Sequence, residues 1–520
     1  MKWGKRFPYF SLMIVSLILL VFVPSSNEAI ESKKGVWILS LKECIELALK
    51  RNLDIISERI NPRIQEVEIV KEKAVFDPSL AFETKKNKSV SEPTSILSGA
   101  GVEWWIGRFL GWRETLEQES LDFNVGLTEK IPTGGQYELK FINTKFKTSS
   151  IYEYYDESYS SSLYISFVQP LLKNFGLNVN RARIRIASNN RDISMGQLKI
   201  KVTAVISELQ ETYWGLVAAI EELEVRRQSL ELAQNLLAQN RILVKEGRLP
   251  SVATLQAENA VASRKEGVLL AQNAVKDAQD RLKKIVNLMD EPTQEERPIL
   301  PSDRPHFIEK NTNVADSYEL ALANRAELNQ ARIALANQEL AFKLAKNQIL
   351  PKLDILASYR LTGTDPHYRD NINEVFDRDM YSWEAGVVLE IPLGNRLAKS
   401  EYSQEKMKLR QAKIKLDSTK KDILLEVRKV VREIETNRER IELTRTARVL
   451  AEEKLKAEEE RFKLGRSTTT DLLKFQEELS LAKSSENRAL VDCRKSLSRW
   501  EAATGQTIEE NNIEIASTED

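Results

Sequence analysis

The sequence predicts an α+β protein made of two structural repeats, each with a helix, a block of β-strands and a long helical hairpin. Three observations predict this fold: a segment that occurs twice, alternating residues after a proline, and very long amphipathic stretches without proline. The chain has 520 residues, of which 30% are charged and only 7% are aromatic. This composition is typical of proteins that are dominated by long helices.

The duplicated segment defines the two repeats. Ile45-Glu-Leu-Ala-Leu-Lys-Arg-Asn-Leu-Asp-Ile is similar to Tyr318-Glu-Leu-Ala-Leu-Ala-Asn-Arg-Ala-Glu-Leu. Each segment opens an amphipathic helix, and a proline follows at the same distance, Pro78 in the first copy and Pro351 in the second. We therefore expect a first repeat over residues 37–290 and a second over residues 313–505.

Alternating polar and apolar residues predict β-strands at about 79–170 and about 352–392. One such run is Leu121-Asp-Phe-Asn-Val-Gly-Leu. A period of two residues indicates a strand whose sides meet different environments. An ordinary half-buried sheet and a barrel strand with one lipid-facing side produce the same alternation, so the pattern leaves both interpretations open.

Each strand block is followed by a very long helix, which ends at Gly247 in the first repeat and at Gly465 in the second. Apolar residues recur at intervals of three and four, as they do in coiled coils. At ~1.5 Å per residue, each helix spans roughly 100 Å. The chain then turns and returns as a helix, so we expect long helical hairpins over residues 181–290 and 396–504.

The remaining segments are short. Basic residues near the N-terminus precede an apolar run, which predicts a signal peptide at residues 1–29. The apolar run is shorter than the roughly 20 residues that cross a bilayer, which disfavours the alternative of a single membrane anchor. Four prolines indicate an irregular linker at residues 291–312, and residues 506–520 form a polar tail.

Composition and motifs argue against several classes of protein. Lys+Arg and Asp+Glu both total 77, so no excess of positive charge points to a nucleic-acid partner. His306 and His367 are the only histidines, which argues against a metal cluster of histidine and cysteine. No glycine-rich phosphate loop and no nucleophile-elbow motif occurs. We expect neither catalytic activity nor a bound cofactor or metal, and we expect Cys44 and Cys493 to be free thiols rather than a disulfide.

Several motifs carry a family resemblance. They are Leu39-Ser-Leu-Lys-Glu-Cys-Ile-Glu-Leu-Ala-Leu-Lys-Arg-Asn, Gln169-Pro-Leu-Leu-Lys-Asn-Phe-Gly, the two glycine turns, and Trp500-Glu-Ala-Ala-Thr-Gly. In their order, spacing and duplication they resemble the TolC-like outer membrane efflux proteins. The similarity extends from about residue 37 to residue 505.

The resemblance implies a homotrimer in the cell outer membrane. In that family the strands of three chains form one transmembrane β-barrel in the lipid, and the helices form a long coiled-coil barrel that extends into the periplasm. The implied function is a passive channel that exports substrates together with a periplasmic adaptor protein and an inner membrane transporter. A secreted or surface coiled-coil protein of structural function is the alternative.

The chain departs from the family pattern in one respect. The family has four strands per chain, whereas an additional hairpin is predicted here near residues 121–147, with Thr133-Gly-Gly-Gln as its turn. Either the barrel is larger than the family's twelve-stranded one or this hairpin lies outside it, and we expect the second. A tryptophan-rich segment with Trp104, Trp105 and Trp112 suits either a lipid headgroup boundary or a loop packed on itself.

The turns between the long helices are the candidate adaptor-docking sites, because the family implies that they face the inner membrane. Their residues are Gly247, Arg248, Leu249, Gly465, Arg466 and Ser467. A glycine there allows the left-handed conformation that ends a helix, and Ser251 or Thr468 is a candidate cap for the returning helix. The simpler interpretation is that these residues only form turns.

Asp471 is the candidate for a periplasmic gate. The family narrows its mouth with acidic residues one turn after the second tip, and Asp471 stands at such a position. A second acidic residue is not found three positions later, where this chain has Lys474. A first-turn aspartate that interacts with the helix dipole is an equally good explanation.

Overall fold

The computed structural model describes residues 36–92, 115–150, 153–289, 297–306, 310 and 312–513. The expected signal peptide at residues 1–29 and the tryptophan-rich segment around Trp104 therefore lie outside the described residues. Parts of the expected linker at 291–312 and the end of the tail also lie outside them.

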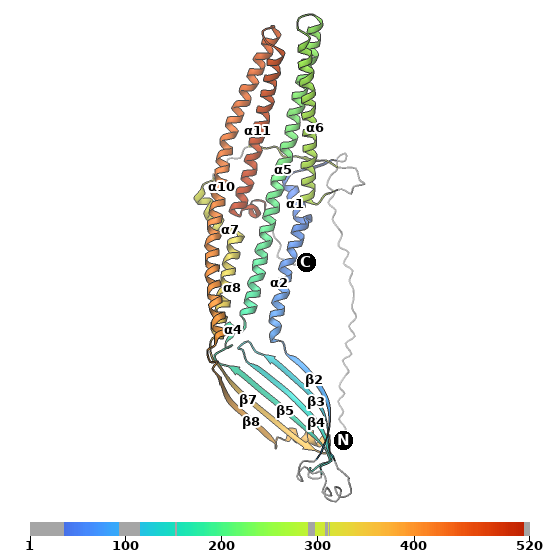
Figure 1. Ribbon diagram of the computed structural model, residues 1–520, viewed down its shortest axis with the longest axis vertical. Helices are drawn as coiled ribbons and strands as arrows, with labels where there is room; N and C mark the ends of the chain where they lie inside the picture. The colour runs from blue at the N-terminus through green and yellow to red at the C-terminus, as the bar shows by residue number, and fades with distance from the viewer. Residues whose placement is uncertain are drawn as a thin grey trace, which may run out of the picture.

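The molecule is elongated, with a sheet at one end and long helices rising from it (Figure 1). The sheet has six antiparallel strands in the order β2-β3-β4-β5-β7-β8. Their bounds are β2 Ser79–Ser91, β3 Leu116–Lys130, β4 Gln136–Thr148, β5 Glu157–Pro170, β7 Lys352–Asp365 and β8 Tyr381–Glu390.

The additional hairpin, which is expected to lie outside the barrel, is instead part of one sheet with the other four strands. β3 pairs with β2 over residues 116–128, and β4 pairs with β5 over residues 136–147. Thr133 and Gly134 lie in the turn between β3 and β4. In this position the hairpin forms ladder hydrogen bonds with β2 and with β5, which satisfies backbone donors and acceptors of all four strands.

The second repeat has a helix at the place where the first has this hairpin. α9 (Tyr368–Asp377) connects β7 to β8 and packs on the sheet. The Asn371 side chain donates to the Ser161 hydroxyl at 2.6 Å. Gly363 permits this approach, because a β-carbon at that position would come within 2.3 Å of the Asn371 carbonyl oxygen.

The strand register gives the sheet an apolar face and a polar face. Residues on one side of a strand face the same way across every rung of an antiparallel sheet. The apolar face carries Phe82, Phe123, Phe141, Ile165, Tyr359 and Trp383 among others. The polar face carries Glu83, Asn124, Lys140, Ser166, Arg360 and Glu384 among others.

The helices stand on the sheet in columns (Figure 1). Next to the sheet, α2 (Leu53–Lys73), α5 (Ala182–Lys245), α8 (Ala326–Gln348) and α10 (Arg396–Lys463) pack in that order. Farther away, α6 (Val252–Val286) packs on α5, and α11 (Thr469–Thr504) packs between α5 and α10. The expected hairpins are thus α5 with α6 and α10 with α11. Short helices α4 (Leu177–Asn180), α12 (Thr507–Glu510) and η1 (Ala74–Phe76) complete these segments.

Both repeats interrupt their opening helix at equivalent residues. In the first repeat, α1 (Leu41–Arg51) ends at Asn52, whose side chain accepts from the backbone N–H of Asp54 and Ile55 and so starts α2. In the second repeat, α7 (Val314–Asn324) ends at Arg325, and α8 begins directly after it. In each repeat, the duplicated sequence segment continues through this break, so it includes the end of one helix and the start of the next.

Two hydrophobic cores hold the middle of the molecule together. The core of the first repeat is centred on α5, where Leu209, Tyr213 and Leu216 are fully buried. The Tyr213 hydroxyl donates to the Asp303 carboxylate at 2.9 Å, and this carboxylate also accepts from the Leu41 N–H. In the second repeat, the indole N–H of Trp500 donates to the Ser317 hydroxyl at 2.9 Å.

Part of the expected linker is more ordered than its prolines predict. β6 (Ile299–Pro301) pairs in parallel with β1 (Trp37–Leu39). Cys44 and Cys493 are buried free thiols, as expected. Burial in the first core raises the pKa of the Cys44 thiol to about 12.

Among the described residues, none of the helices combines the length and the apolar character that crossing a lipid bilayer requires.

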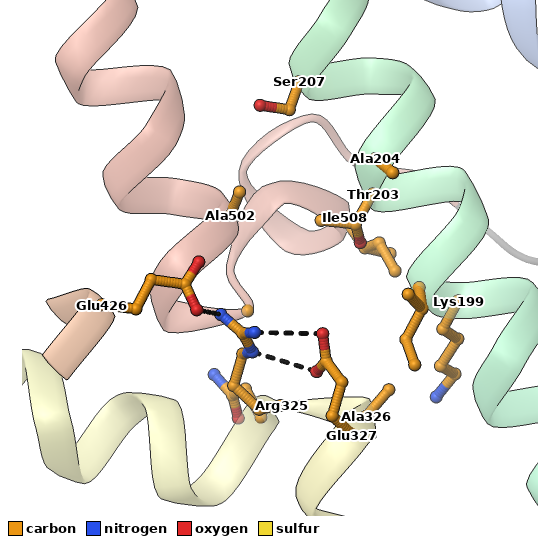
Figure 2. A pocket seen from close by; sticks show the side chains of 13 residues that line it. Lys199, Thr203, Ala204, Ser207, Arg325, Ala326, Glu327, Glu426, Ala502 and Ile508 are labelled. Carbon is orange, nitrogen blue, oxygen red and sulfur yellow. Dashed lines mark hydrogen bonds and ion pairs between the residues drawn. The ribbon is translucent and has the colours of Figure 1, made fainter. Parts of the chain in front are cut away.

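Arg325 is held in a cavity of about 270 Å³ between the two repeats (Figure 2). Its guanidinium donates to Glu327 at 2.9 and 3.0 Å and to Glu426 at 2.9 Å, and it also reaches the Ala503 carbonyl at 3.2 Å. Only 12% of this side chain is exposed, so one residue links α8, α10 and the end of α11.

Replacing Arg325 with methionine should lower the thermal unfolding midpoint of the solubilised protein. The substitution keeps much of the side-chain volume but leaves two carboxylates and one carbonyl without their donor, at a cost of about 2 kcal/mol. Arg332→Met, an exposed position on the same helix, is the matched control and should change the midpoint little. Equal midpoints for the two variants would contradict the assigned role of Arg325.

Glu501→Gln should stabilise the protein at neutral pH. Burial raises the pKa of the Glu501 carboxyl above its ordinary value of 4.5. Its charged form is therefore disfavoured in the fold, and removing the charge should raise the unfolding midpoint at pH 7.5. The gain should shrink as the pH falls through the raised pKa and should vanish below about pH 4.5, whereas the exposed Glu509→Gln should show no such profile.

Candidate functional site

The two hairpin tips lie next to each other at the end of the molecule opposite the sheet (Figure 1). In the first tip, Gly247 has a φ of +70° and its N–H donates to the Val244 carbonyl, while the Arg248 N–H donates to the Leu243 carbonyl. These two bonds form the Schellman arrangement, which satisfies the last carbonyls of a helix and favours glycine at the left-handed position.

The second tip repeats this geometry. Gly465 has a φ of +69°, its N–H donates to the Phe462 carbonyl, and the Arg466 N–H donates to the Arg461 carbonyl. The returning helices start differently. The Thr468 side chain accepts from the Asp471 N–H and caps α11, whereas Ser251 is itself helical and makes no side-chain cap for α6, so the capping expectation is wrong for Ser251.

The predicted tip residues divide into exposed and packed positions. Gly247, Arg248, Gly465 and Arg466 are exposed. Leu249 instead packs on a cluster that joins both hairpins and whose buried members are Leu236, Leu455, Phe462, Leu472 and Leu479. The Ser467 hydroxyl donates to the Glu458 carboxylate.

The two arginines are the charges that the tips present to solvent. Arg248 contacts Glu246 at 3.5 Å through an exposed ion pair, and such pairs contribute little to stability. Within the described residues, Arg466 makes no ion pair. Both guanidinium groups can therefore reach a protein that approaches the tips.

Asp471 is exposed on the first turn of α11. Its carboxylate accepts from the Thr468 hydroxyl at 2.6 Å, and that hydrogen bond holds the pKa of Asp471 below its usual range. Lys474 adds a smaller electrostatic contribution in the same direction. Asp471 is thus ionised and hydrogen-bonded to the cap, while its function as a gate residue stays a prediction.

Two polar residues that the sequence did not single out connect the hairpins below the tips. The Asn240 amide, which is fully buried, donates to the Ala253 carbonyl at 3.1 Å and to the Thr469 hydroxyl at 3.0 Å. Farther down, the Arg264 guanidinium donates to the Ser229 carbonyl at 2.8 Å and to the Gln476 side chain at 2.9 Å.

These contacts tie the first hairpin to α11 of the second. Burial lowers the pKa of the Arg264 guanidinium, which nevertheless stays charged because arginine titrates far above neutral pH. In the sequence, Arg264 stands in the ordinary helical run Ser-Arg-Lys-Glu and nothing distinguishes it from the neighbouring charges. Only the packing of α6 against both α5 and α11 gives it three oxygen acceptors.

One group of potential metal ligands occurs in the described part of the chain. Donor atoms of Asp365, His367 and Asp370 lie within 4.8 Å of one another at the start of α9. The Asp365 carboxylate accepts from the His367 N–H at 2.7 Å, a local turn contact that accounts for the closeness of these residues.

Arg264→Met should loosen α11 from the first hairpin. The variant leaves the carbonyls of Ser229 and Leu473 and the Gln476 side chain without a donor, which weakens the local structure by about 2 kcal/mol. Amide hydrogen exchange over residues 469–480 should become at least about tenfold faster. The exposed neighbour Lys265→Met is the control, and unchanged exchange in Arg264→Met would contradict the proposed link.

Comparison with known proteins identifies solved structures that have a similar fold. Three solved structures cover nearly the whole chain. The match to the CmeC outer membrane channel of Campylobacter jejuni covers 91% of this chain and 90% of the CmeC chain, with 14% sequence identity and a TM-score of 0.63. The match to the MtrE outer membrane channel of Neisseria gonorrhoeae covers 90% of this chain and 89% of the MtrE chain, with 17% sequence identity and a TM-score of 0.62. The match to the outer membrane protein VceC of Vibrio cholerae covers 89% of this chain and 96% of the VceC chain, with 15% sequence identity and a TM-score of 0.61.

At these identities the solved structures establish a shared fold. No curated protein sequence matches the chain. The sequence model of the family described as outer membrane efflux protein matches residues 143–288 and 317–506, which are more than half of the chain and fall in both repeats. This protein is therefore a member of the outer membrane efflux protein family.

Proposed function

We propose that three copies of this chain form a passive export channel in the outer membrane. The observation that carries the proposal is a sheet with one apolar and one polar face at the end of a helical wall roughly 100 Å long. An apolar outer face suits lipid, and a polar inner face suits a water-filled pore. Six strands are too few to close around a wide pore, so several chains must contribute.

The helical part extends from the membrane into the periplasm in this proposal. The charged surfaces of α5 and α10 suit an aqueous compartment, and their length suits a tunnel that crosses it. Such a conduit works by its shape and by the charges that line it, and it needs neither a catalytic residue nor a cofactor. A structural coiled-coil protein would use the helices in the same way but would have no need of a sheet with an apolar face.

A periplasmic adaptor protein and an inner membrane transporter are the proposed partners. The tips stand farthest from the sheet, so they are the part of the chain that reaches toward the inner membrane. Gly247 and Gly465 shape two similar turns, and Arg248 and Arg466 present positive charge there. An adaptor with acidic or carbonyl groups on its contact surface would be complementary to these arginines.

The channel proposal has a direct test in planar lipid bilayers. Protein purified from the outer membrane fraction should migrate as a trimer and should produce stepwise ion conductance. A protein that remains monomeric in water after export, and that adds no conductance to the bilayer, would refute the proposal.

The docking proposal predicts a specific loss of export. Arg248→Glu combined with Arg466→Glu should reduce export and co-purification of the adaptor about tenfold or more, because like charges then face the partner. The trimer and its conductance should be unaffected, since both side chains are exposed. Lys276→Glu, an exposed charge on α6 away from the tip, is the control. Normal export by the double variant would exclude docking through these arginines.

A further inference from the structure

Among the described residues, the sheet of one chain has two edges without a partner strand. β2 and β8 each hydrogen-bond to one neighbour only. All residues of β2 and all but one of β8 are exposed, whereas the strands between them are mostly half-buried. An open edge presents a row of backbone donors and acceptors, which proteins normally shorten, bend or cover. Here both edges are regular strands, of 13 and 10 residues.

The helices beside these strands are uncovered on the same sides. α2 leads into β2, and β8 leads into α10, so we call α2 with β2 the first edge and β8 with α10 the second edge (Figure 1). Each helix carries an exposed apolar stripe whose members recur at nearly whole helical turns. The stripe on α2 is Leu53, Ile56, Ile60, Ile64, Val67 and Val70. The stripe on α10 is Met407, Ile414, Leu425, Leu443 and Leu450.

We propose that the first edge of one copy pairs with the second edge of the next, so that three copies close a barrel of eighteen strands, six from each. This inference rests on the proposed trimeric channel and adds its strand number and its contact surfaces. The two edges are different surfaces, so the contact is head-to-tail and repeats until the ring closes. β2 and β8 run in opposite directions, so the new strand pair is antiparallel like the five within the chain.

The stagger of the strands fits this closure. A line of paired residues starts at Ser79, the first residue of β2, and passes Thr128, Glu138, Ser166 and Ser358 to reach Glu384 on β8. Glu384 lies six residues before Glu390, the end of β8. If Ser79 of the next copy pairs with Glu390, the pairing register shifts by six residues along the strand direction for every six strands around the ring.

This advance determines the tilt of the strands. With ~3.3 Å per residue along a strand and ~4.8 Å between strands, it corresponds to a tilt of about 35° from the barrel axis, within the roughly 35–45° of closed barrels. With this register, the strands of one chain have the slope of a closed barrel.

The β3–β4 hairpin sets the width of the pore. At this tilt, eighteen strands enclose a backbone diameter of about 35 Å, whereas the twelve that remain without the hairpin enclose about 23 Å. The wider ring needs all six strands in one sheet, and β3 and β4 are paired on both sides along their length.

Disulfide cross-linking tests the edge contact. In a Cys44→Ala, Cys493→Ala background, Thr84→Cys on β2 and Ala385→Cys on β8 should face each other across neighbouring copies, on the apolar face. Oxidation should convert most of the protein to covalent dimers and trimers that revert on reduction. Glu83→Cys with Ala385→Cys is the control, because residue 83 faces the opposite side of the sheet.

A second pair, Lys86→Cys with Ala385→Cys, tests for an edge contact in which the strand register is shifted by two residues. The absence of cross-links from both matched pairs in outer membrane protein would overturn the edge contact.

Electron microscopy of the solubilised oligomer tests the strand number. An end-on view should show a threefold ring with a barrel about 35 Å across. A threefold ring about 23 Å across would overturn the eighteen-strand barrel and leave the trimeric channel intact. A protein that stays monomeric would instead refute the proposed function itself.

Discussion

Continuous antiparallel pairing across both repeats is the constraint on which the rest of the structure depends. β5 is the last strand of the first repeat and β7 is the first strand of the second, and they pair along most of their length. Every strand lies beside the next in chain order, so the helices that enter and leave the sheet must also rise side by side. The helical columns follow from this order, and so do the two open edges.

The two repeats meet the same structural demands with different residues. The break in the opening helix is stabilised by the Asn52 cap in the first repeat and by the Arg325 guanidinium in the second. Between the strands, the first repeat inserts the β3–β4 hairpin, which widens the sheet, and the second inserts α9, which covers part of it. The two repeats therefore share the arrangement of helices and strands, and they differ in the connections between strands.

The tips combine exposed charge with internal rigidity. The turn backbones bond to their own helices, and the buried Asn240 and the half-buried Arg264 hold the two hairpins together just below. Buried hydrogen-bonded groups of this kind specify one arrangement of the helices. In the proposed channel, a partner at the tips would meet a preorganised surface, and any movement of the mouth would have to separate these contacts.

The sequence by itself determined the two repeats, the long hairpins, the amphipathic strands and the glycine turns. These features are local or periodic, because a period of two or of three to four residues reports which sides of an element are buried. It did not determine the place of the β3–β4 hairpin, since alternation shows that a segment is a strand and not which strand it pairs with. The contacts of Arg264 and Arg325 were likewise decided only in the tertiary structure. Most of their acceptors come from helices far apart in the chain, and only the packing of those helices brings these oxygens within hydrogen-bond distance.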